Sequence, residues 1–210
     1  MTAAADKLVG AIVGGRYEIV RELGRGGMGA IYEVRHVKLD RLFAMKVISC
    51  DLTPEAMVRF EREAQMIARL RHRNVVEIVD VELLEDGSPC MVMELLSGET
   101  LEDRLQRQGT LTPDEVDRIL WPLLDGLEQV HGAGFLHRDI KPANILLNAA
   151  GDPTLIDFGA AREAMVGRTS AMTAIFTPGY AAAEQMTSAK QGPWTDIYGL
   201  AATLYHAIAG

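Results

Sequence analysis

The first fifty residues alternate between hydrophobic and polar positions in a way that predicts β-strands. RYEIVREL (16–23) and AIYEVRHV (30–37) alternate with a period of two, and LFAMKVIS (42–49) is a third apolar segment with a single charge inside it, Lys46. A period of two is typical of strands that bury one face. Residues 16–48 are therefore expected to form strands around a glycine-rich turn.

The segments that follow, from residue 54 to residue 134, predict one helix, then two further strands, then two helices. PEAMVRFEREAQMIARLR (54–71) opens with Pro54, a favourable first-turn residue, and has apolar residues at helical spacing. VVEIVDVELLEDGSPCMVMELL (75–96) predicts two strands joined by a turn at residues 86–89. TLEDRLQRQG (100–109) and TPDEVDRILWPLLDGLEQVHGAG (112–134) are helical and end near glycine.

The apolar tail IYGLAATLYHAIAG (197–210) predicts a buried helix. The chain is thus β-rich at first and α-rich later, with the change near residues 94–100. This order predicts an α+β fold of two lobes. A ligand would most naturally bind between two such lobes.

Composition narrows the classes of function. The chain has 210 residues and a formal net charge of −8, which disfavours a nucleic-acid partner because such proteins usually carry a basic face. Cys50 and Cys90 form no CxxC pair and are expected to be free thiols in a reducing compartment. The sequence shows no signal-peptide pattern and no apolar segment long enough to span a membrane, so we expect a cytoplasmic location.

The glycine-rich turn LGRGGMGAI places Gly24, Gly26 and Gly29 in the spacing G-x-G-x-x-G. Glycines let backbone amides approach a phosphate group. The spacing alone is equally consistent with a flexible hairpin. A dinucleotide site would need a helix directly after the turn, whereas a strand-like segment follows here.

Lys46 lies inside an apolar segment, where an ammonium group needs an anionic partner. Glu63 could provide it, since Ile67 and Leu70 mark the apolar stripe of the helix at helical spacing from it. Glu61 is the competing candidate and is expected on the solvated face. An alternative interpretation makes Lys46 a lysine on an edge strand whose ammonium reaches solvent.

The segment HRDIKPAN (137–144) places several ionisable residues between two apolar stretches. Buried charges are costly unless they are paired or used. Asp139 can accept a proton or orient a hydroxyl group, Lys141 can neutralise a phosphate group, and Asn144 can ligate a hard cation. Asp157 ends a later apolar strand and could hold Mg²⁺. Together they predict a loop for a triphosphate and its metal.

With HRDIKPAN, DFG at 157–159, the glycine turn and AMK at 44–46 in this order, residues 15–210 resemble a protein kinase. GRGGMGAIYEV and TPGYAAAEQ resemble the eukaryotic-like serine/threonine kinases of bacteria. The lysine two residues after Asp139 is the serine/threonine pattern. The resemblance implies a bilobal kinase fold, with an N-terminal extension at 1–15, a β-rich N-lobe at 16–94 and a partial α-helical C-lobe at 95–210.

The resemblance also implies roles for particular residues. Asp139, Lys141 and Asn144 would be catalytic, and Asn144 and Asp157 would ligate Mg²⁺, which Mn²⁺ could replace. Met93 would be the gatekeeper, and Glu94 and Leu96 the hinge. The full set implied to bind ATP is Leu23, Gly24, Arg25, Gly26, Gly27, Met28, Gly29, Ala30, Ile31, Ala44, Lys46, Glu63, Met93, Glu94, Leu96 and Leu146.

By the same resemblance, His137 and Phe158 belong to a hydrophobic spine, so His137 is structural. Arg138 would pair with a phosphorylated residue of the segment from Asp157 to about Glu184. Thr169, Ser170 and Thr173 are the candidate phosphosites, and autophosphorylation is expected. Thr177 resembles the threonine that lines the substrate pocket, and Asp196 the acid that holds the catalytic loop.

Two features depart from the family pattern. Ala183 stands where proline is usual, and Glu184 lacks its usual arginine partner, which lies in a later helix. The expected C-lobe is incomplete, so the helix at 197–209 would expose an apolar patch that could mediate self-association. The expected function is ATP-dependent transfer to serine or threonine of a protein substrate. The alternative is a weak or inactive ATP-binding scaffold.

Overall fold

The computed structural model describes residues 8–26, 29–48, 53–158, 177–187 and 189–210. Within the first helix it leaves out the side chains of Pro54, Ala56, Arg59 and Glu63. The chain forms two compact units. Unit 1 contains the chain up to Arg69 together with Glu77–Leu96, and unit 2 contains Leu70–Val76 and Ser97–Gly210.

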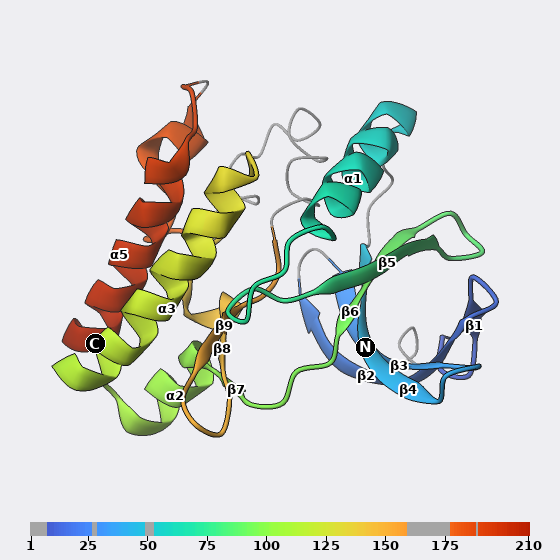
Figure 1. The fold of residues 1–210 in the computed structure, drawn as a ribbon, viewed down its shortest axis with the longest axis horizontal. Helices are drawn as coiled ribbons and strands as arrows, with labels where there is room; N and C mark the ends of the chain where they lie inside the picture. The colour runs from blue at the N-terminus through green and yellow to red at the C-terminus, as the bar shows by residue number, and fades with distance from the viewer. Residues whose placement is uncertain (1–7, 27–28, 49–52, 159–176, 188) are drawn as a thin grey trace. The chain divides into compact units, whose positions relative to one another are not determined.

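Unit 1 is built on a six-stranded antiparallel sheet with the order β1-β2-β3-β4-β6-β5. Its strands are β1 (Ile12–Val13), β2 (Tyr17–Gly26), β3 (Gly29–His36), β4 (Arg41–Ile48), β5 (Ile78–Leu83) and β6 (Pro89–Glu94). Figure 1 shows them as blue to green arrows. The alternating residues of β2, the buried residues of β3 and the apolar run of β4 supply a core that includes Tyr17, Ile19, Val34, Phe43 and Met45. The expected strands and the turn before β6 are confirmed.

Lys46 lies on an interior strand, since β4 pairs with β3 on one side and with β6 on the other. The residue is 8% exposed. The edge-strand interpretation is therefore wrong. A lysine at such a position is retained only when an anionic group compensates its charge.

The helix α1 (Pro54–Ile67) is shorter than the sequence pattern predicts. The amide of Arg69 donates to the carbonyl of Met66, three residues back, which tightens and ends the helix. Leu70 therefore lies beyond the helix, in unit 2, and does not continue the apolar stripe of Ile67. Ile67 itself is buried, as are Phe60 and Ala64 on the same face.

Cys90 on β6 is fully buried and its thiol donates to the carbonyl of Glu82. Burial raises the pKa of the Cys90 thiol to about 12. The reactive thiolate is therefore scarce at pH 8. In a Cys50→Ser variant we expect iodoacetamide to leave Cys90 unmodified in the folded chain and to alkylate it in urea, as measured by mass spectrometry. Equal labelling in both states would contradict the burial of this thiol.

Unit 2 is mainly helical and contains a small sheet of three strands, β7-β8-β9. Its helices α2 and α3 each begin with a capping box, Thr100 with Asp103 and Thr112 with Glu115. Such a box satisfies backbone amides that the helix itself leaves free. The elements in chain order are β7 (Glu99–Thr100), α2 (Leu101–Gln108), α3 (Pro113–Gly132), η2 (Pro142–Asn144), β8 (Ile145–Leu147), β9 (Pro153–Leu155), η4 (Ala183–Met186) and α5 (Pro193–Ala209).

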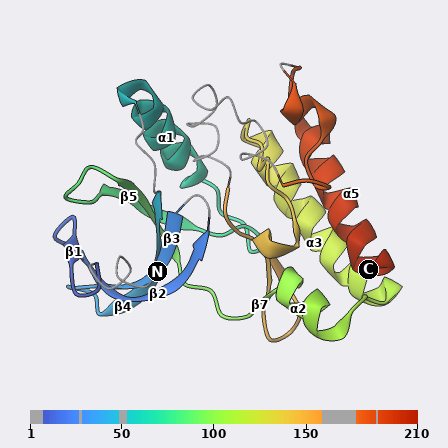
Figure 2. The same ribbon diagram turned by 180° about the vertical axis from the view of Figure 1, so that it is seen from behind.

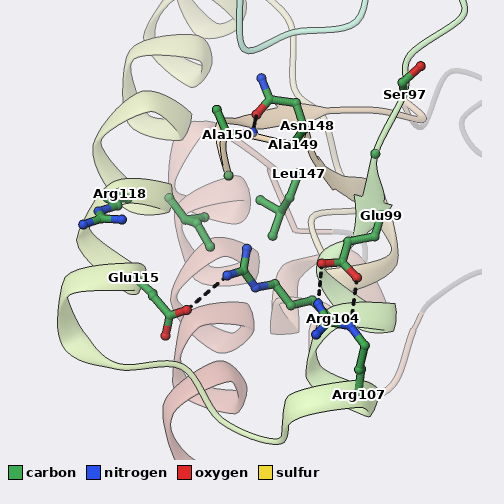
Figure 3. Close-up of a pocket in the computed structure, with 13 residues that line it drawn as sticks. Ser97, Glu99, Arg104, Arg107, Glu115, Arg118, Leu147, Asn148, Ala149 and Ala150 are labelled. Carbon is green, nitrogen blue, oxygen red and sulfur yellow. Dashed lines mark hydrogen bonds and ion pairs between the residues drawn. The ribbon is translucent and has the colours of Figure 1, made fainter.

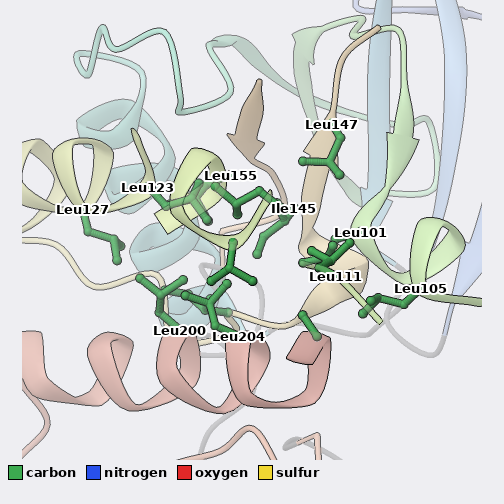
Figure 4. Close-up of a cluster of buried hydrophobic side chains, with 14 residues drawn as sticks. Leu101, Leu105, Leu111, Leu123, Leu127, Ile145, Leu147, Leu155, Leu200 and Leu204 are labelled. Atoms are coloured by element: carbon green, nitrogen blue, oxygen red, sulfur yellow. The ribbon is translucent and has the colours of Figure 1, made fainter. Parts of the chain in front are cut away.

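The core of unit 2 lies where α2, α3 and α5 meet β8 and β9 (Figure 4). Leu123 and Leu127 of α3 and Leu200 and Leu204 of α5 are buried there, and the two helices lie side by side in both views of the ribbon (Figures 1 and 2). Among the described residues, no helix is long and apolar enough to cross a membrane.

The prediction that the C-terminal helix is buried is correct for only one of its faces. Leu200, Leu204 and Ala207 are buried, whereas Tyr198, Tyr205 and others on the opposite face are exposed. Apolar residues occur all round this helix, so the sequence pattern alone did not separate the two faces. Self-association through the exposed face stays a prediction.

Candidate catalytic site

Asp196 of α5 holds the start of the 137–144 segment from within the core of unit 2. Its carboxylate accepts hydrogen bonds from the backbone amides of His137, at 2.8 Å, and Arg138, at 2.7 Å. A third contact joins it to Nε2 of His131 at 2.8 Å. Asp196 is 1% exposed, so these contacts are made out of solvent. The backbone of Arg138 has a positive φ of 65°, and the two bonds to Asp196 support this bend.

His137 is a packing residue, as the sequence predicts. It is fully buried, and its Nδ1 accepts the backbone amide of Asp139 at 3.3 Å. Its Nε2 therefore carries the proton and donates to the carbonyl of Ile156 at 3.0 Å. The imidazole ring lies 4.7 Å from the ring of Phe158. Nδ1 thus braces the 137–144 segment internally, and Nε2 joins this segment to the chain that leads to Asp157.

Asp139, Lys141, Asn144 and Thr177 form one polar cluster. Nζ of Lys141 lies 3.3 Å from Oδ2 of Asp139 and donates to Oγ1 of Thr177 at 3.1 Å. The amide group of Asn144 donates to Oδ2 and to the backbone carbonyl of Asp139, both at 2.8 Å. Thr177 also reaches Oδ1 of Asp139 at 3.4 Å. The structure therefore brings the three predicted catalytic residues together. Thr177, which lies 36 residues after Lys141 in the chain, contacts Lys141 in the same cluster.

The position of Asn144 suits a hard cation. Its Nδ2 is used by Asp139, which leaves the amide oxygen as the group available to a metal. Its backbone carbonyl accepts a hydrogen bond from the amide of Ile156 at 3.0 Å. This bond holds the chain beside Asn144 one residue before Asp157. Among the described residues, no group of three or more His, Cys, Asp and Glu side chains could hold a metal. Mg²⁺ usually takes only one or two carboxylates and completes its shell with phosphate oxygens and water.

Two residues that support this cluster, His131 and Gln185, are not predicted from the sequence. His131 contacts Asp196 from the last turn of α3. Gln185, 7% exposed, donates from its amide group to the carbonyl of Arg138 at 2.8 Å and accepts the backbone amide of Ala182. A histidine on an apolar helix face and a glutamine after Glu184 carry no local signal, because their partners lie far away in the sequence.

Glu184 and Ala183 lie where the sequence departs from the family pattern. Ala183 is exposed, and Glu184 accepts a hydrogen bond from the hydroxyl of Thr195 at 2.7 Å. The glutamate thus has a partner within the described chain, although it is not the arginine that the resemblance implies.

In unit 1, the three glycines of the G-x-G-x-x-G spacing have different roles. A Cβ atom at Gly24 or Gly26 would meet nothing within 4 Å. A Cβ atom at Gly29 would lie 1.9 Å from the carbonyl oxygen of Val47, and φ at Gly29 is 147°. The sheet itself therefore requires glycine at 29, whereas open space lies beside the other two. Arg25 is held by both carboxylate oxygens of Glu22.

Other predicted nucleotide residues of unit 1 lie on neighbouring strands. Ala44 is opposite Met93 in the β4–β6 pair, and Lys46 is opposite Met91 in that pair and Ile31 in the β3–β4 pair. The amide of Glu94 donates to the carbonyl of Glu77, so this amide is already used within unit 1. Gly27, Met28 and the side chain of Glu63 lie outside what the structure describes.

The remaining residues that the sequence predicts to bind ATP differ in their exposure to solvent. Leu23 is 39% exposed and Ala30 is buried. Leu96 makes no backbone hydrogen bond within the described part of the chain. In unit 2, Leu146 is half-buried between the buried residues Ile145 and Leu147, so its side chain points to the opposite face of β8.

Comparisons with known proteins match most of the chain to one family. A family model described as "Protein kinase domain" matches residues 17–210. The serine/threonine-protein kinase PknK of Mycobacterium tuberculosis is 39% identical over 195 residues, which are 92% of this chain and 18% of that protein. PknL of the same organism is 35% identical over 209 residues, which are 98% of this chain and 52% of PknL.

A solved structure described as "PpkA-294 apo form" has the same fold. It superposes with a TM-score of 0.81 at 30% identity, and the match covers 96% of this chain and 78% of that one. The β-rich unit 1 and the helical unit 2 agree with the two lobes that the sequence predicts. The chain spans only 18% of the length of PknK and 52% of the length of PknL.

Proposed function

The chain belongs to the protein kinase family, and from this premise we propose that it transfers the γ-phosphate of ATP to serine or threonine hydroxyls of protein substrates. The observation that carries the proposal is the cluster of Asp139, Lys141 and Asn144 with Thr177. An ammonium group and an amide group that both contact one carboxylate suit phosphoryl transfer, which depends on positioning and charge.

We propose the following division of work in unit 2. Asp139 accepts the hydrogen bond of the substrate hydroxyl and orients its oxygen, and Asn144 fixes the carboxylate through its amide group. Lys141 neutralises charge that develops on the transferred phosphate group. Thr177 orients Lys141 and lies beside Asp139, where a substrate hydroxyl must arrive.

We further propose that Asn144 and Asp157 hold Mg²⁺ and that Mn²⁺ can replace it. When bound, the cation would neutralise negative charge on the phosphate oxygens. Unit 1 would hold the nucleotide through Lys46, the backbone around Gly24 and Gly26, and the hinge residues Glu94 and Leu96. The open space beside both glycines supports this assignment. We take residues 16–94 as the N-lobe and 95–210 as the C-lobe.

Transfer of labelled phosphate from γ-labelled ATP to a generic acceptor protein such as casein, followed by identification of the modified amino acid, tests the proposal. Label on serine or threonine supports it, and label on neither excludes it for this chain. The alternative, an ATP-binding scaffold without activity, predicts nucleotide binding and no transfer.

Replacing Asp157 tests the assignment of the cation. Asp157 has a positive φ of 64°, which asparagine tolerates better than alanine, so Asp157→Asn removes the charge with little backbone strain. We expect calorimetry to show at least about tenfold weaker binding of Mg²⁺–ATP, since even supporting residues of metal sites cost that much. Asp125→Asn, an exposed change on α3, is the control. In excess EDTA the variant and the parent chain should bind alike. Equal affinity with Mg²⁺ would contradict the assignment.

Two further expectations stay predictions. Thr169, Ser170 and Thr173, the candidate autophosphorylation sites, lie outside the described residues. The cytoplasmic location likewise stays a prediction.

A further inference from the structure

A surface pocket of about 520 Å³ lies in unit 2 and contains none of the residues of the catalytic cluster. It is lined by the ends of β7 and β8, the turn that joins β8 to β9, and the facing sides of α2 and α3 (Figure 3). Pockets that hold small ligands usually have volumes of roughly 300 to 1,000 Å³. Glycine at 98 is required here, because a Cβ atom would lie 2.1 Å from the carbonyl oxygen of Leu147. The wall of the pocket is therefore close-packed backbone.

The pocket is positively charged in a protein of net charge −8. Three arginines, Arg104, Arg107 and Arg118, line it together with two glutamates, Glu99 and Glu115. Arg107 is paired with Glu99, whose carboxylate accepts hydrogen bonds from both Nε and Nη2 of the arginine. Arg118 is exposed and forms no ion pair with any described residue. One positive charge therefore remains without a carboxylate.

Arg104 is oriented by its neighbours and keeps part of its hydrogen-bonding capacity. Its Nε donates to Gln108, and its Nη2 donates to Glu115 at 3.1 Å. Its Nη1 donates to no described residue and faces the β8–β9 turn, where a Cβ atom built on Gly151 would lie 3.9 Å from it. The side chain is only 24% exposed. Such a guanidinium is already ordered, so a ligand that bound it would lose little side-chain entropy.

We propose that this pocket binds the carboxylate or phosphate group of a small ligand, held by Nη1 of Arg104 and by Arg118. A guanidinium group offers paired N–H donors that match the oxygens of either anion. The proposal rests on the pocket alone and does not require that the chain be an active kinase. It concerns a second site, distinct from the residues proposed to handle ATP.

Titration followed by ¹H–¹⁵N NMR tests it with three matched probes. These are N-acetyl-phosphoserine methylamide, N-acetyl-aspartate methylamide and the neutral N-acetyl-serine methylamide. We expect a charged probe to shift the backbone amides of Gly98 and of residues 149–151 saturably, and the neutral probe to leave them unchanged. Whether the phosphate or the carboxylate probe binds more tightly identifies the source of the anion.

Variants locate the binding group. Arg104→Gln should weaken binding at least about tenfold, the usual effect of losing a charge-assisted hydrogen bond. Glu99→Gln should release Arg107 and strengthen binding roughly two- to fivefold, as expected for loss of an exposed ion pair. Arg35→Gln in unit 1, which removes the same charge from the Arg35–Asp40 pair, should change nothing.

The proposal is overturned if neither charged probe shifts these amides, if the neutral probe shifts them equally, or if the shifts occur only in the 137–144 segment. It is also overturned if Arg104→Gln binds like the parent chain. Should Arg104→Gln fail to fold, Arg118→Gln decides, because Arg118 supports no ion pair among the described residues. An unchanged affinity in that variant would then reject the site.

Discussion

Asp139→Asn is expected to reduce phosphate transfer by about 10²- to 10⁴-fold, the range that positioned acid–base groups supply. The asparagine has the same shape but no negative charge. It can accept from Asn144 or from Thr177, but it cannot compensate the ammonium of Lys141 at 3.3 Å. Its weaker acceptor oxygen also orients a substrate hydroxyl less strongly.

Binding of ATP should survive this change, because Asp139 is not among the residues proposed to hold the nucleotide or the cation. Two measurements are therefore needed. Initial rates with γ-labelled ATP measure phosphate transfer, and calorimetry with Mg²⁺–ATP measures binding. The control is Asp125→Asn, which makes the same chemical change on the exposed surface of α3. Equal rates in the Asp139 variant and the parent chain would exclude catalysis by this cluster. Loss of ATP binding would show instead that Asp139 supports the nucleotide site.

Much of this cluster was predictable because its residues are close in sequence. Asp139, Lys141 and Asn144 lie within six positions, and buried apolar segments on both sides limit where their side chains can go. The strands of unit 1 were predictable for a similar reason, since a period of two can satisfy only one buried face.

The supporting contacts were not predictable, because each depends on a partner distant in sequence. His131 is a single histidine on an apolar helix and acquires its role only from Asp196, 65 residues away. Gln185 likewise depends on a backbone carbonyl 47 residues earlier. The glycine spacing predicts that Gly29 approaches a phosphate group, and only the pairing of β3 with β4 reveals that its proximity to Val47 also requires glycine.

The helix ends show a second limit of the sequence pattern. Apolar residues at helical spacing continue to Leu70, yet α1 ends at Ile67. Leu70 belongs to unit 2, so tertiary packing decides the boundary that local preference leaves open. The apolar tail of the chain has the same ambiguity, because the pattern does not say which face of α5 is buried.

Asp196→Asn is expected to lower the free energy of unfolding by about 2 to 4 kcal/mol, since hydrogen bonds to a buried charged group contribute roughly 1.5 to 3 kcal/mol each. One carboxylate oxygen accepts from Arg138, and the other accepts from both His137 and His131. An asparagine must place its NH₂ group at one of these positions. Either orientation sets a donor against a backbone N–H donor, which leaves a buried polar group unsatisfied.

The same change should also reduce transfer in protein that remains folded. Asp196 supports the positive φ of Arg138. Asp139 is the next residue in the chain, so a change in the backbone of Arg138 would displace it. A displacement of about 1 Å at a catalytic group can cost roughly 10²-fold in rate. Urea unfolding measures the stability, and rates taken well below the unfolding transition measure the positioning.

Asp125→Asn again gives the matched control for Asp196→Asn. A lower midpoint with an unchanged dependence on urea would show that the native state lost stability without a change in the surface exposed on unfolding. If the midpoint and the rate both equalled those of the parent chain, Asp196 would not hold the 137–144 segment. If stability fell while the rate did not, the segment would have a second support, and Gln185, bonded to the carbonyl of Arg138, would be the residue to replace next.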